Sequence, residues 1–314
     1  MNRLSLVFLF WCMCSITMAQ KYLLVIHGGA GNIDEKSLTN ADEYRQSLDT
    51  ALTIGENILK NGGSSLDAVE SVIKYFEDNP LYNAGKGAVL TDKGTVELDA
   101  SIMDGKTMLA GAVAGVTDIK HPISAARLVM EKTSHVLLIS KGASAFAKEQ
   151  GLKMVPNEYF ITPENKKRYE KNKENDIHGT VGCVAMDTKG NLAAGTSTGG
   201  MMLKKYGRVG DSPIIGAGTY ACNASCAVSC TGYGEYFIRN CVAFHVHALM
   251  IYKGLSVNNA VSFVIDSVLT PQHGTGGIIA VDKNGNYSWD FNTTGMFRGV
   301  ATSENKHLVQ LFGK

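Results

Sequence analysis

This sequence has few prolines and almost no net charge. Only 6 of its 314 residues are proline, and 30 basic residues nearly balance 29 acidic ones, so that the net charge is +1. Without a basic excess, nothing indicates binding to nucleic acid or to an anionic surface. The 34 glycines instead indicate many tight turns between short elements. With 45% hydrophobic residues, the chain is long enough for one large domain, or two small ones, with a sizeable core.

A disulfide framework is also missing. Of the seven cysteines, the five that lie beyond residue 19 are Cys183, Cys222, Cys226, Cys230 and Cys241. An odd number without the spacing of a small disulfide-rich domain permits a bridge but does not require one. The spacing of Cys222, Cys226 and Cys230 would align them on a helix, but residues 221–232 are typical of a strand and a turn, and soft-metal sites use CxxC pairs. A thiol or metal-binding protein is one alternative interpretation.

No apolar run is long enough to cross a membrane comfortably, although residues 4–14 are almost all apolar. Small residues, Thr17 and Ala19, stand three and one positions before a cut preceding Gln20. This pattern predicts a signal peptide over residues 1–19 and export to the periplasm or out of the cell. A buried N-terminal strand is the alternative. Lipid attachment through a cysteine of the apolar run is disfavoured by bulky neighbours.

Helices and strands follow one another in groups along the rest of the chain. Helical periodicity and capping residues predict helices over residues 40–61, 64–79, 122–132, 142–150, 235–252 and 257–268. Apolar or alternating runs predict a hairpin about residues 189–191 and strands over residues 22–26, 88–91, 95–103, 110–118, 135–139, 214–221, 224–229, 276–282 and 286–292. This order suits sheets packed face to face with helices on both outer faces.

Residues 151–179 break the pattern. Between residues 164 and 176 the chain has five basic and four acidic residues and hardly any apolar ones. Such a composition predicts a solvated, mobile linker, and it is the only clear internal boundary. The linker ends at Gly179, and Thr180 begins a strand-like alternation.

A threonine at this boundary has a chemical option that an internal threonine lacks. If the bond between Gly179 and Thr180 breaks, Thr180 gains a free α-amine beside its own hydroxyl. An α-amine titrates near ~7.7–8.0, so it can act as a general base at neutral pH. One residue would then supply both the nucleophile and the base. On its own, a threonine that starts a strand is more often only a β-former.

Other polar groups lie at strand ends or in glycine-rich turns, where binding sites are usually built. Arg208 and Asp211 share one turn and can bind the carboxylate and the ammonium of an amino acid, although such a pair is usually a surface ion pair. Asn83 and the Thr231-Gly232 pair can donate hydrogen bonds to an oxyanion. Together with Thr180, these groups suit hydrolysis of an amino-acid amide. The turn after residue 26 has neither the GxGxxG spacing nor the Walker lysine, so it predicts a close approach of backbone to a site rather than phosphate binding.

Seven sequence blocks resemble the plant-type L-asparaginase/isoaspartyl peptidase family, a branch of the N-terminal nucleophile hydrolases. They run in order over essentially the whole chain beyond residue 19. They are His27-Gly28-Gly29-Ala30-Gly31, Asn83-Ala84-Gly85, Leu98-Asp99-Ala100-Ser101-Ile102-Met103-Asp104-Gly105, His178-Gly179-Thr180-Val181-Gly182, Thr196-Ser197-Thr198-Gly199-Gly200, Gly207-Arg208-Val209-Gly210-Asp211-Ser212-Pro213 and Thr231-Gly232-Tyr233-Gly234-Glu235.

The resemblance implies an α+β fold, a four-layer αββα sandwich that forms one catalytic domain. It also implies a precursor that cuts itself between Gly179 and Thr180 into an α subunit, residues 20–179, and a β subunit, residues 180–314. Two such pairs would form an (αβ)₂ dimer. The implied activity is a threonine amidohydrolase that cleaves β-aspartyl dipeptides and L-asparagine and releases L-aspartate, without a cofactor for catalysis.

The same resemblance assigns the site. Thr180 would be the nucleophile, assisted by Thr198 and Asn83. The implied substrate-binding residues are Arg208, Val209, Gly210, Asp211, Thr231, Gly232, Tyr233 and Gly234. A structural sodium ion would be held by the backbone of Phe76, Glu77, Asn79, Tyr82, Ala84 and Lys86, of which the sequence shows only the loop.

Two features depart from the family pattern or leave a choice open. Tyr233 stands where relatives often have histidine, which puts the shape of the pocket in doubt. A second branch, the glycosylasparaginases, shares the nucleophile and the Arg208–Pro213 block. That branch usually has aspartate before the threonine, where this chain has Gly179, and it usually lacks the first two blocks. Glycosylasparaginase is therefore the main alternative function.

Overall fold

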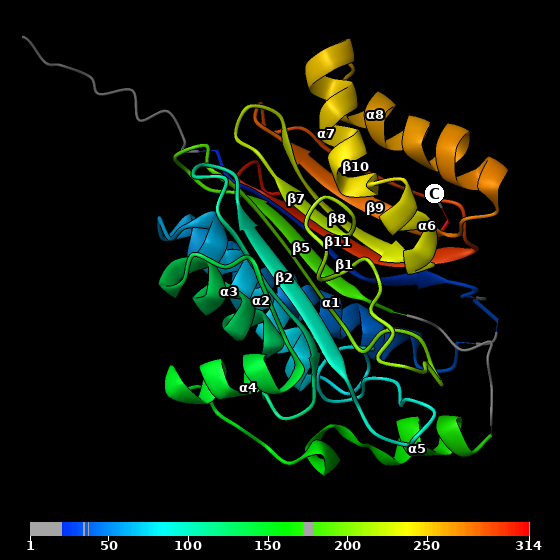
Figure 1. Cartoon of the computed structure of the whole chain (residues 1–314). Helices are drawn as coiled ribbons and strands as arrows, with labels where there is room; N and C mark the ends of the chain where they lie inside the picture. Colours follow the sequence, from blue (N-terminus) through cyan, green and yellow to red (C-terminus); the bar gives the residue numbers. More distant parts are fainter. Residues whose placement is uncertain (1–20, 34, 37, 172–178, 314) are drawn as a thin grey trace, which may run out of the picture.

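Two β-sheets form the centre of this protein, seen here in a computed structural model (Figure 1). The structure describes residues 21–33, 35–36, 38–171 and 179–313. The predicted signal segment, residues 1–19, and the end of the predicted linker, residues 172–178, lie outside the described residues. The fold is of mixed α/β composition, as the sequence predicts.

The larger sheet interleaves the two ends of the chain. Its neighbours are antiparallel except for β3 and β4. Across the sheet the order is β12 (His307–Phe312), β11 (Gly295–Thr302), β1 (Leu23–Gly31), β5 (Val181–Met186), β6 (Leu192–Thr198), β2 (Leu98–Asp104), β3 (Ala110–Val116) and β4 (Leu137–Ile139). The first strand therefore lies between two strands from the second half of the chain.

The smaller sheet packs on the middle of the larger one. Its order is β10 (Tyr287–Phe291), β9 (Gly276–Asp282), β8 (Cys226–Gly232) and β7 (Thr219–Ala221). Strands β8 and β9 contact β1 and β5. Leu23 and Val25 of β1 face this inter-sheet core, whereas Leu24 and Ile26 face the core beneath the helices. Burial on both faces explains why the first strand is a continuous apolar run.

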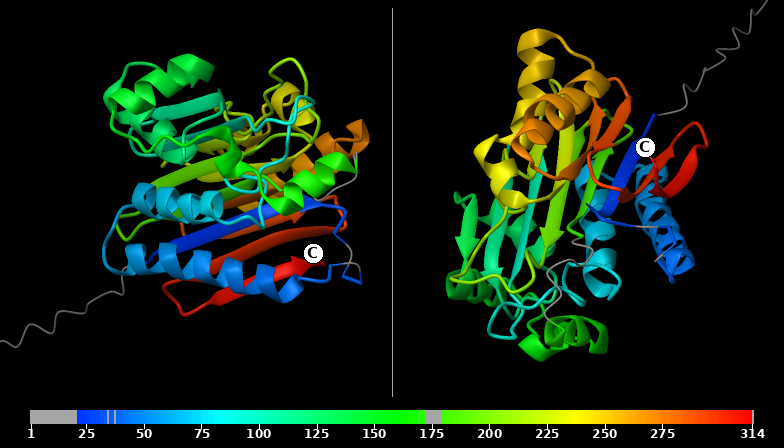
Figure 2. Two further views of the ribbon diagram at one scale, coloured as in Figure 1. Left: turned by 90° about the horizontal axis from the view of Figure 1, so that it is seen from below. Right: turned by 90° about the vertical axis from the view of Figure 1, so that its right-hand side faces the viewer.

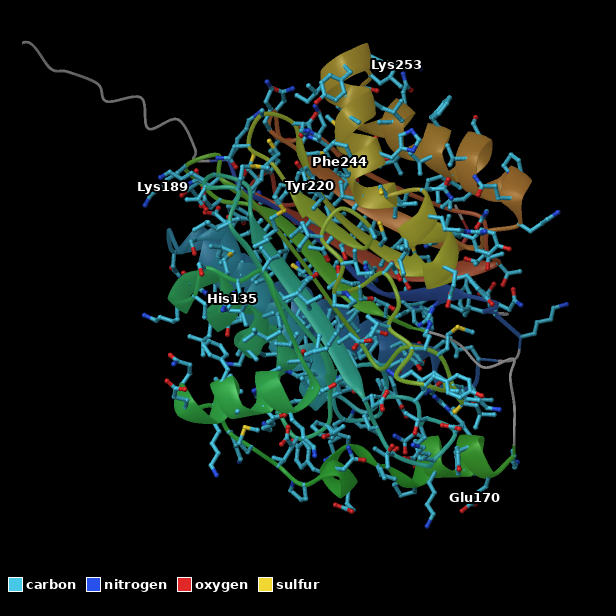
Figure 3. All side chains as sticks on the ribbon, viewed as in Figure 1. His135, Glu170, Lys189, Tyr220, Phe244 and Lys253 are labelled. Carbon is cyan, nitrogen blue, oxygen red and sulfur yellow. The ribbon has the colours of Figure 1, made fainter. Side chains whose placement is uncertain are left out.

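Helices cover both sheets (Figure 2). Against the larger sheet pack α1 (Ala41–Lys60), α2 (Ser65–Asp78), α3 (Pro122–Lys132) and α4 (Ser140–Glu149). Against the smaller sheet pack α6 (Gly234–Arg239), α7 (Val242–Lys253) and α8 (Val257–Phe263). The rings of Tyr220 on β7 and Phe244 on α7 meet edge to face there, with centroids 5.3 Å apart (Figure 3). Within the described residues, no helix has both the length and the apolar character needed to span a membrane.

The predicted linker contains regular structure that its charged composition does not indicate. A 3-10 turn, η1 (Asn157–Phe160), precedes helix α5 (Pro163–Glu170). Thr162 and Asn165 form a reciprocal capping box at the start of α5, and the Phe160 side chain is fully buried. Capping and one buried aromatic ring thus order a segment whose charge predicts only a linker. The prediction of irregular structure is wrong for these two elements.

Other boundaries differ for equally local reasons. Residues 88–91 are buried but pair with loops rather than in a strand; Val89 N, for example, donates to Asn83 Oδ1. The predicted helix 235–252 is two helices, because Cys241 has a left-handed φ of 45° between them. Residues 264–269 continue from α8 as a π-helical segment, η2 (Val264–Leu269), followed by η3 (Thr270–Gln272). Strands β11 and β12 were not expected from the sequence.

Candidate active site at the start of strand β5

Thr180 lies immediately before β5, in the middle of the larger sheet. Its Oγ1 donates a hydrogen bond to Thr198 Oγ1 at 3.1 Å, and Thr198 Oγ1 accepts another from the backbone N–H of Gly200 at 3.0 Å. The antiparallel pairing of β5 with β6 places Val181 opposite Ser197. Thr198, at the end of β6, therefore lies beside Thr180, just before the start of β5.

The glycines of β1 pack against the residue that precedes Thr180. A bulge follows His27, and Gly29 has a φ of +113°. A Cβ on Gly29 would lie 2.2 Å from the Cα of Gly179, and a Cβ on Gly179 would lie 2.6 Å from the carbonyl oxygen of Gly28. The sequence predicts a turn here, but β1 continues to Gly31 as a bulged strand. The predicted close approach of backbone to a site is present.

A cavity of about 450 Å³ opens beside Thr180. It is lined by Ala30, Gly31, Asn32, Asn83, Thr180, Thr198, Gly200, Met201, Arg208, Gly210, Asp211, Ser212, Gly232, Tyr233, Thr275, Asn292, Thr293 and Thr294. Eight predicted site residues thus share one cavity. Val209, Thr231 and Gly234 are not among its lining residues. Asn292, Thr293 and Thr294, which follow β10, were not predicted, because short polar loops carry no distinctive signal.

Asp211 is a buried carboxylate without a full set of partners. Its side chain is buried, and no hydrogen-bond donor among the described residues reaches its Oδ2. Burial raises the pKa of Asp211 to about 7, although the nearby Arg208 charge opposes the rise. Because Asp211 lines the cavity, a cationic group entering it would supply the missing partner.

Arg208 is held by the carboxylate of Glu235, which is not among the predicted site residues. Arg208 Nε donates to Glu235 Oε1 at 2.9 Å, and Nη2 donates to Oε2 at 2.7 Å. These bonds, more than the Arg208 charge alone, hold the pKa of Glu235 below its usual range. The only sequence signal was the place of Glu235 at the end of the last motif. A two-point pair fixes the plane of the guanidinium at the cavity wall.

Asn83 and Thr231 differ in how their polar atoms are used. Asn83 Nδ2 donates to the carbonyl oxygen of Gly200 at 2.8 Å, which leaves one amide hydrogen on the same nitrogen. Thr231 is fully buried, and its Oγ1 has no partner among the described residues. Asn83 therefore faces the cavity with a donor to spare, whereas Thr231 lies behind the wall formed by Gly232.

The loop proposed to hold sodium has carbonyl groups of two kinds. The carbonyl oxygen of Glu77 accepts a hydrogen bond from Lys86 N at 2.7 Å, and that of Asn79 accepts one from Tyr82 N. Within the described residues, the carbonyl oxygens of Tyr82, Ala84 and Lys86 accept none. Free carbonyl oxygens are the hard ligands that suit an alkali cation, so those of Tyr82, Ala84 and Lys86 fit the ion that the resemblance implies. The carbonyl oxygen of Phe76, like those of Glu77 and Asn79, already accepts a backbone hydrogen bond.

Two of the three cysteines considered for a metal site are packing residues. Cys226 and Cys230 lie buried on strand β8. Burial raises the pKa of Cys226 to about 12, so its sulfur is a thiol rather than a metal-binding thiolate at neutral pH. Among the described residues, no group of three or more histidine, cysteine, aspartate or glutamate side chains could hold a metal ion.

Comparison with known proteins gives a match over nearly the whole chain. Residues 20–310 match the asparaginase family. An isoaspartyl peptidase of Salmonella typhimurium is 48% identical over 298 residues, covering 88% of this chain and 94% of the relative. A probable isoaspartyl peptidase/L-asparaginase of Arabidopsis thaliana is 44% identical, covering 90% of this chain and 96% of the relative. The isoaspartyl peptidase/L-asparaginase of Homo sapiens is also 44% identical, covering 91% and 95%.

The relatives correct the predicted location. The bacterial and mammalian isoaspartyl peptidases that resemble this chain are cytosolic enzymes, so the prediction of export to the periplasm or out of the cell is wrong. That prediction rested on apolar residues 4–14, which lie outside the described residues. An apolar run near the start of a chain is a compositional signal, and it does not by itself establish a destination.

Proposed function

Because this chain belongs to the asparaginase family, we propose that it is a hydrolase that releases L-aspartate from β-aspartyl (isoaspartyl) dipeptides and from L-asparagine. The observation that carries the proposal is the content of one cavity. It holds a threonine hydroxyl at a strand start, an oriented guanidinium and an incompletely paired carboxylate. These are the groups needed to attack an amide and to bind an amino acid.

Asp211 and Arg208 would hold the aspartyl part of the substrate. The ammonium group of the substrate supplies the positive partner that Asp211 Oδ2 lacks. The Nη1 nitrogen of Arg208 takes no part in the pair with Glu235, so it is left to bind the α-carboxylate. Gly210 leaves space beside this nitrogen, because a Cβ there would lie 2.8 Å from it. Val209 and Gly234 would contribute by shaping the two turns.

Thr180 would act after the bond to Gly179 is cut. The freed α-amine takes the proton from Oγ1 as the oxygen attacks the side-chain carbonyl carbon of the substrate. The carbonyl oxygen becomes an oxyanion, and the amine then gives the proton to the leaving nitrogen. Ammonia or the next amino acid departs and leaves an aspartyl ester on Thr180. Water attacks the ester in the same way, which frees L-aspartate and restores the hydroxyl.

Hydrogen-bond donors around the cavity would stabilise the oxyanion. Asn83 has one amide hydrogen left for it, and Thr198 Oγ1 accepts the hydrogen bond of the Thr180 hydroxyl. Gly232 and Tyr233 also line the cavity, and the neighbouring Thr231 is buried. Such fixed donors usually make the largest contribution to acyl transfer.

The architecture proposed with this function is the αββα sandwich of the N-terminal nucleophile hydrolases. It is supported by the contacts of each sheet with its own helices and of the two sheets with each other. The α subunit would span residues 20–179 and the β subunit residues 180–314, with two pairs in the dimer. A sodium ion held by the backbone of residues 76–86 would stabilise the loop that carries Asn83.

The test is the mass of the intact protein after a day at neutral pH, beside a Thr180→Ala variant. Two fragments from the native protein, one beginning at Thr180, and an uncut variant support the proposal. Turnover of a β-aspartyl dipeptide, L-asparagine and a glycosylated asparagine is then compared. An uncut, inactive native protein contradicts the mechanism, and preference for the glycosylated substrate indicates a glycosylasparaginase instead.

A further inference from the structure

His27 on β1 contacts both Thr180 and Ser229, a residue of the smaller sheet. Its ring is fully buried, with Nδ1 3.0 Å from the carbonyl oxygen of Thr180 and Nε2 3.0 Å from Ser229 Oγ. Gly182 pairs with His27 across the sheet, and a Cβ at Gly182 would lie 2.2 Å from His27 Nε2 and 2.1 Å from Ser229 Oγ. The missing side chain of Gly182 therefore leaves room for this contact. His27 takes no part in the proposed steps of hydrolysis.

The partners of the ring determine where its proton lies. A carbonyl oxygen can only accept, so the contact with Thr180 requires the proton on Nδ1 of His27. Burial lowers the pKa of His27 to about 3, so the ring is neutral and Nε2 has a lone pair. Ser229 must then donate its hydroxyl hydrogen to Nε2.

Two further hydroxyls are oriented in the same way, since each has one hydrogen to donate. Ser229 has used its hydrogen, and Thr196 Oγ1 lies 2.7 Å from Ser229 Oγ and 3.2 Å from the carbonyl oxygen of Gly218. Thr196 therefore donates to the nearer Ser229. Thr219 in turn donates to Thr196 at 2.6 Å. Ser101 Oγ lies 2.8 Å from Thr219 Oγ1 and 2.6 Å from the carbonyl oxygen of Ser212. All of these hydroxyl-bearing side chains are fully buried, so water does not compete.

We propose that His27 is a positioning residue for Thr180, and that the one-way row of hydroxyls Thr219, Thr196 and Ser229 fixes its tautomer. The inference rests on the proposed role of Thr180 as an N-terminal nucleophile. After the cut, Thr180 is attached to the protein only through its own carbonyl group. Rotation about its Cα–C bond moves the amine and the hydroxyl together. The bond from His27 holds the peptide plane from which both groups project.

The primary test compares two serine variants that differ in location. Ser229→Ala removes the donor to His27, whereas Ser225→Ala removes the hydroxyl 2.6 Å from the ring of His247, another buried histidine, which does not line the cavity. We expect kcat per cleaved molecule to fall about 10- to 100-fold in Ser229→Ala, because the nucleophile is misplaced. KM should stay unchanged, because Arg208 and Asp211, which hold the substrate, are not affected. Ser225→Ala should keep the native kcat. Equal kcat in the two variants would overturn the proposal.

Three further measurements separate positioning from folding and from the proposed function. Thr196→Val keeps the side-chain shape and should also lower kcat, so the test survives if Ser229→Ala does not fold. His27→Asn, which can still donate to the Thr180 carbonyl, should retain more activity than His27→Leu. Nitrogen-15 NMR of labelled histidine should show the His27 proton on Nδ1, and a proton on Nε2 refutes the tautomer whether or not the protein hydrolyses these substrates. An inactive native protein refutes the proposed function instead.

Discussion

Arg208 and Glu235 form two parallel hydrogen bonds, at 2.9 and 2.7 Å, across 27 positions of the chain. The carboxylate thus takes one edge of the guanidinium before any substrate arrives. What remains for an incoming carboxylate is Nη1, held in a fixed plane. Arg208 therefore offers the substrate a guanidinium that Glu235 has already oriented.

The Glu235→Gln variant should bind substrate less well. It keeps the size of the side chain but weakens the charge-assisted bonds that orient Arg208. We expect KM to rise about tenfold with little change in kcat, since a hydrogen bond to a charged group contributes about 1.5–3 kcal/mol. Glu131→Gln, which weakens the pair with Arg127 on α3, is the matched control and should leave KM unchanged. A native KM in Glu235→Gln would show that Arg208 does not depend on its partner.

Removing the Thr198 hydroxyl should slow the chemical step. Thr198→Val keeps the shape of the side chain and removes the bond to Thr180 Oγ1. Because a neutral hydrogen bond contributes about 1 kcal/mol, we expect kcat to fall about fivefold. Thr95→Val breaks the 2.9 Å hydroxyl pair of Thr91 and Thr95, neither of which lines the cavity, and it should not affect kcat. Steady-state rates of both variants with a β-aspartyl dipeptide decide the point.

The carboxyl group of Asp211 should make stability depend on pH. Its pKa is raised to about 7, above the unfolded value, so the folded state binds the proton more tightly. The contribution of Asp211 to stability is therefore most favourable below the pKa that this carboxyl group has in the unfolded chain. It becomes less favourable as the pH rises toward 7. We expect Asp211→Asn to gain stability relative to the native protein from about pH 4 to about pH 7 and to keep that gain above it. Urea unfolding of the uncut Thr180→Ala chain, with and without Asp211→Asn, measures this at several pH values; a gain that does not vary with pH would contradict it.

A side chain at Gly29 should disturb the junction before Thr180. In Gly29→Ala the new Cβ would meet the Cα of Gly179 at 2.2 Å, in addition to the strain of a left-handed φ. Gly62→Ala has the same kind of φ strain, at +79°, but nothing within 4 Å. Gly62→Ala should lose about 1 kcal/mol of stability and be cut normally, whereas Gly29→Ala should lose more and be cut more slowly. Intact mass over time measures the cutting rate, and urea unfolding of each variant in the uncut Thr180→Ala chain measures stability. Equal cutting rates would rule out a role for Gly29 at the junction.

The sequence predicts local features well. Helix α3 has the predicted bounds, and the Ser64 side chain caps α2 as expected, because capping and periodicity are properties of neighbouring residues. The sharing of one cavity by Thr180, Arg208 and Asp211 was also anticipated from the blocks of the family. Their catalytic and binding roles stay predictions until the variants are measured.

What the sequence does not predict depends on distant partners or on single torsion angles. Nothing near Arg208 identifies Glu235 as the residue that will hold it. The break before α7 rests on the left-handed Cys241, which is neither glycine nor proline. Strand β11 contains Gly295 and Gly299, which weaken its pattern, and its place beside β1 comes from long-range pairing. These features follow from tertiary contacts rather than from local preference.

The position of β1 between β11 and β5 bears on how long an active molecule can last. A cut before Thr180 leaves β1 to β4 on one polypeptide and all later strands on another. The larger sheet then consists of strands from two separate polypeptides. Refolding of the uncut chain does not depend on concentration, whereas recovery of the cut protein requires two polypeptides to meet and becomes slower on dilution. Maturation would thus make the fold practically irreversible, and the lifetime of the enzyme would be set by its rate of unfolding rather than by its equilibrium stability.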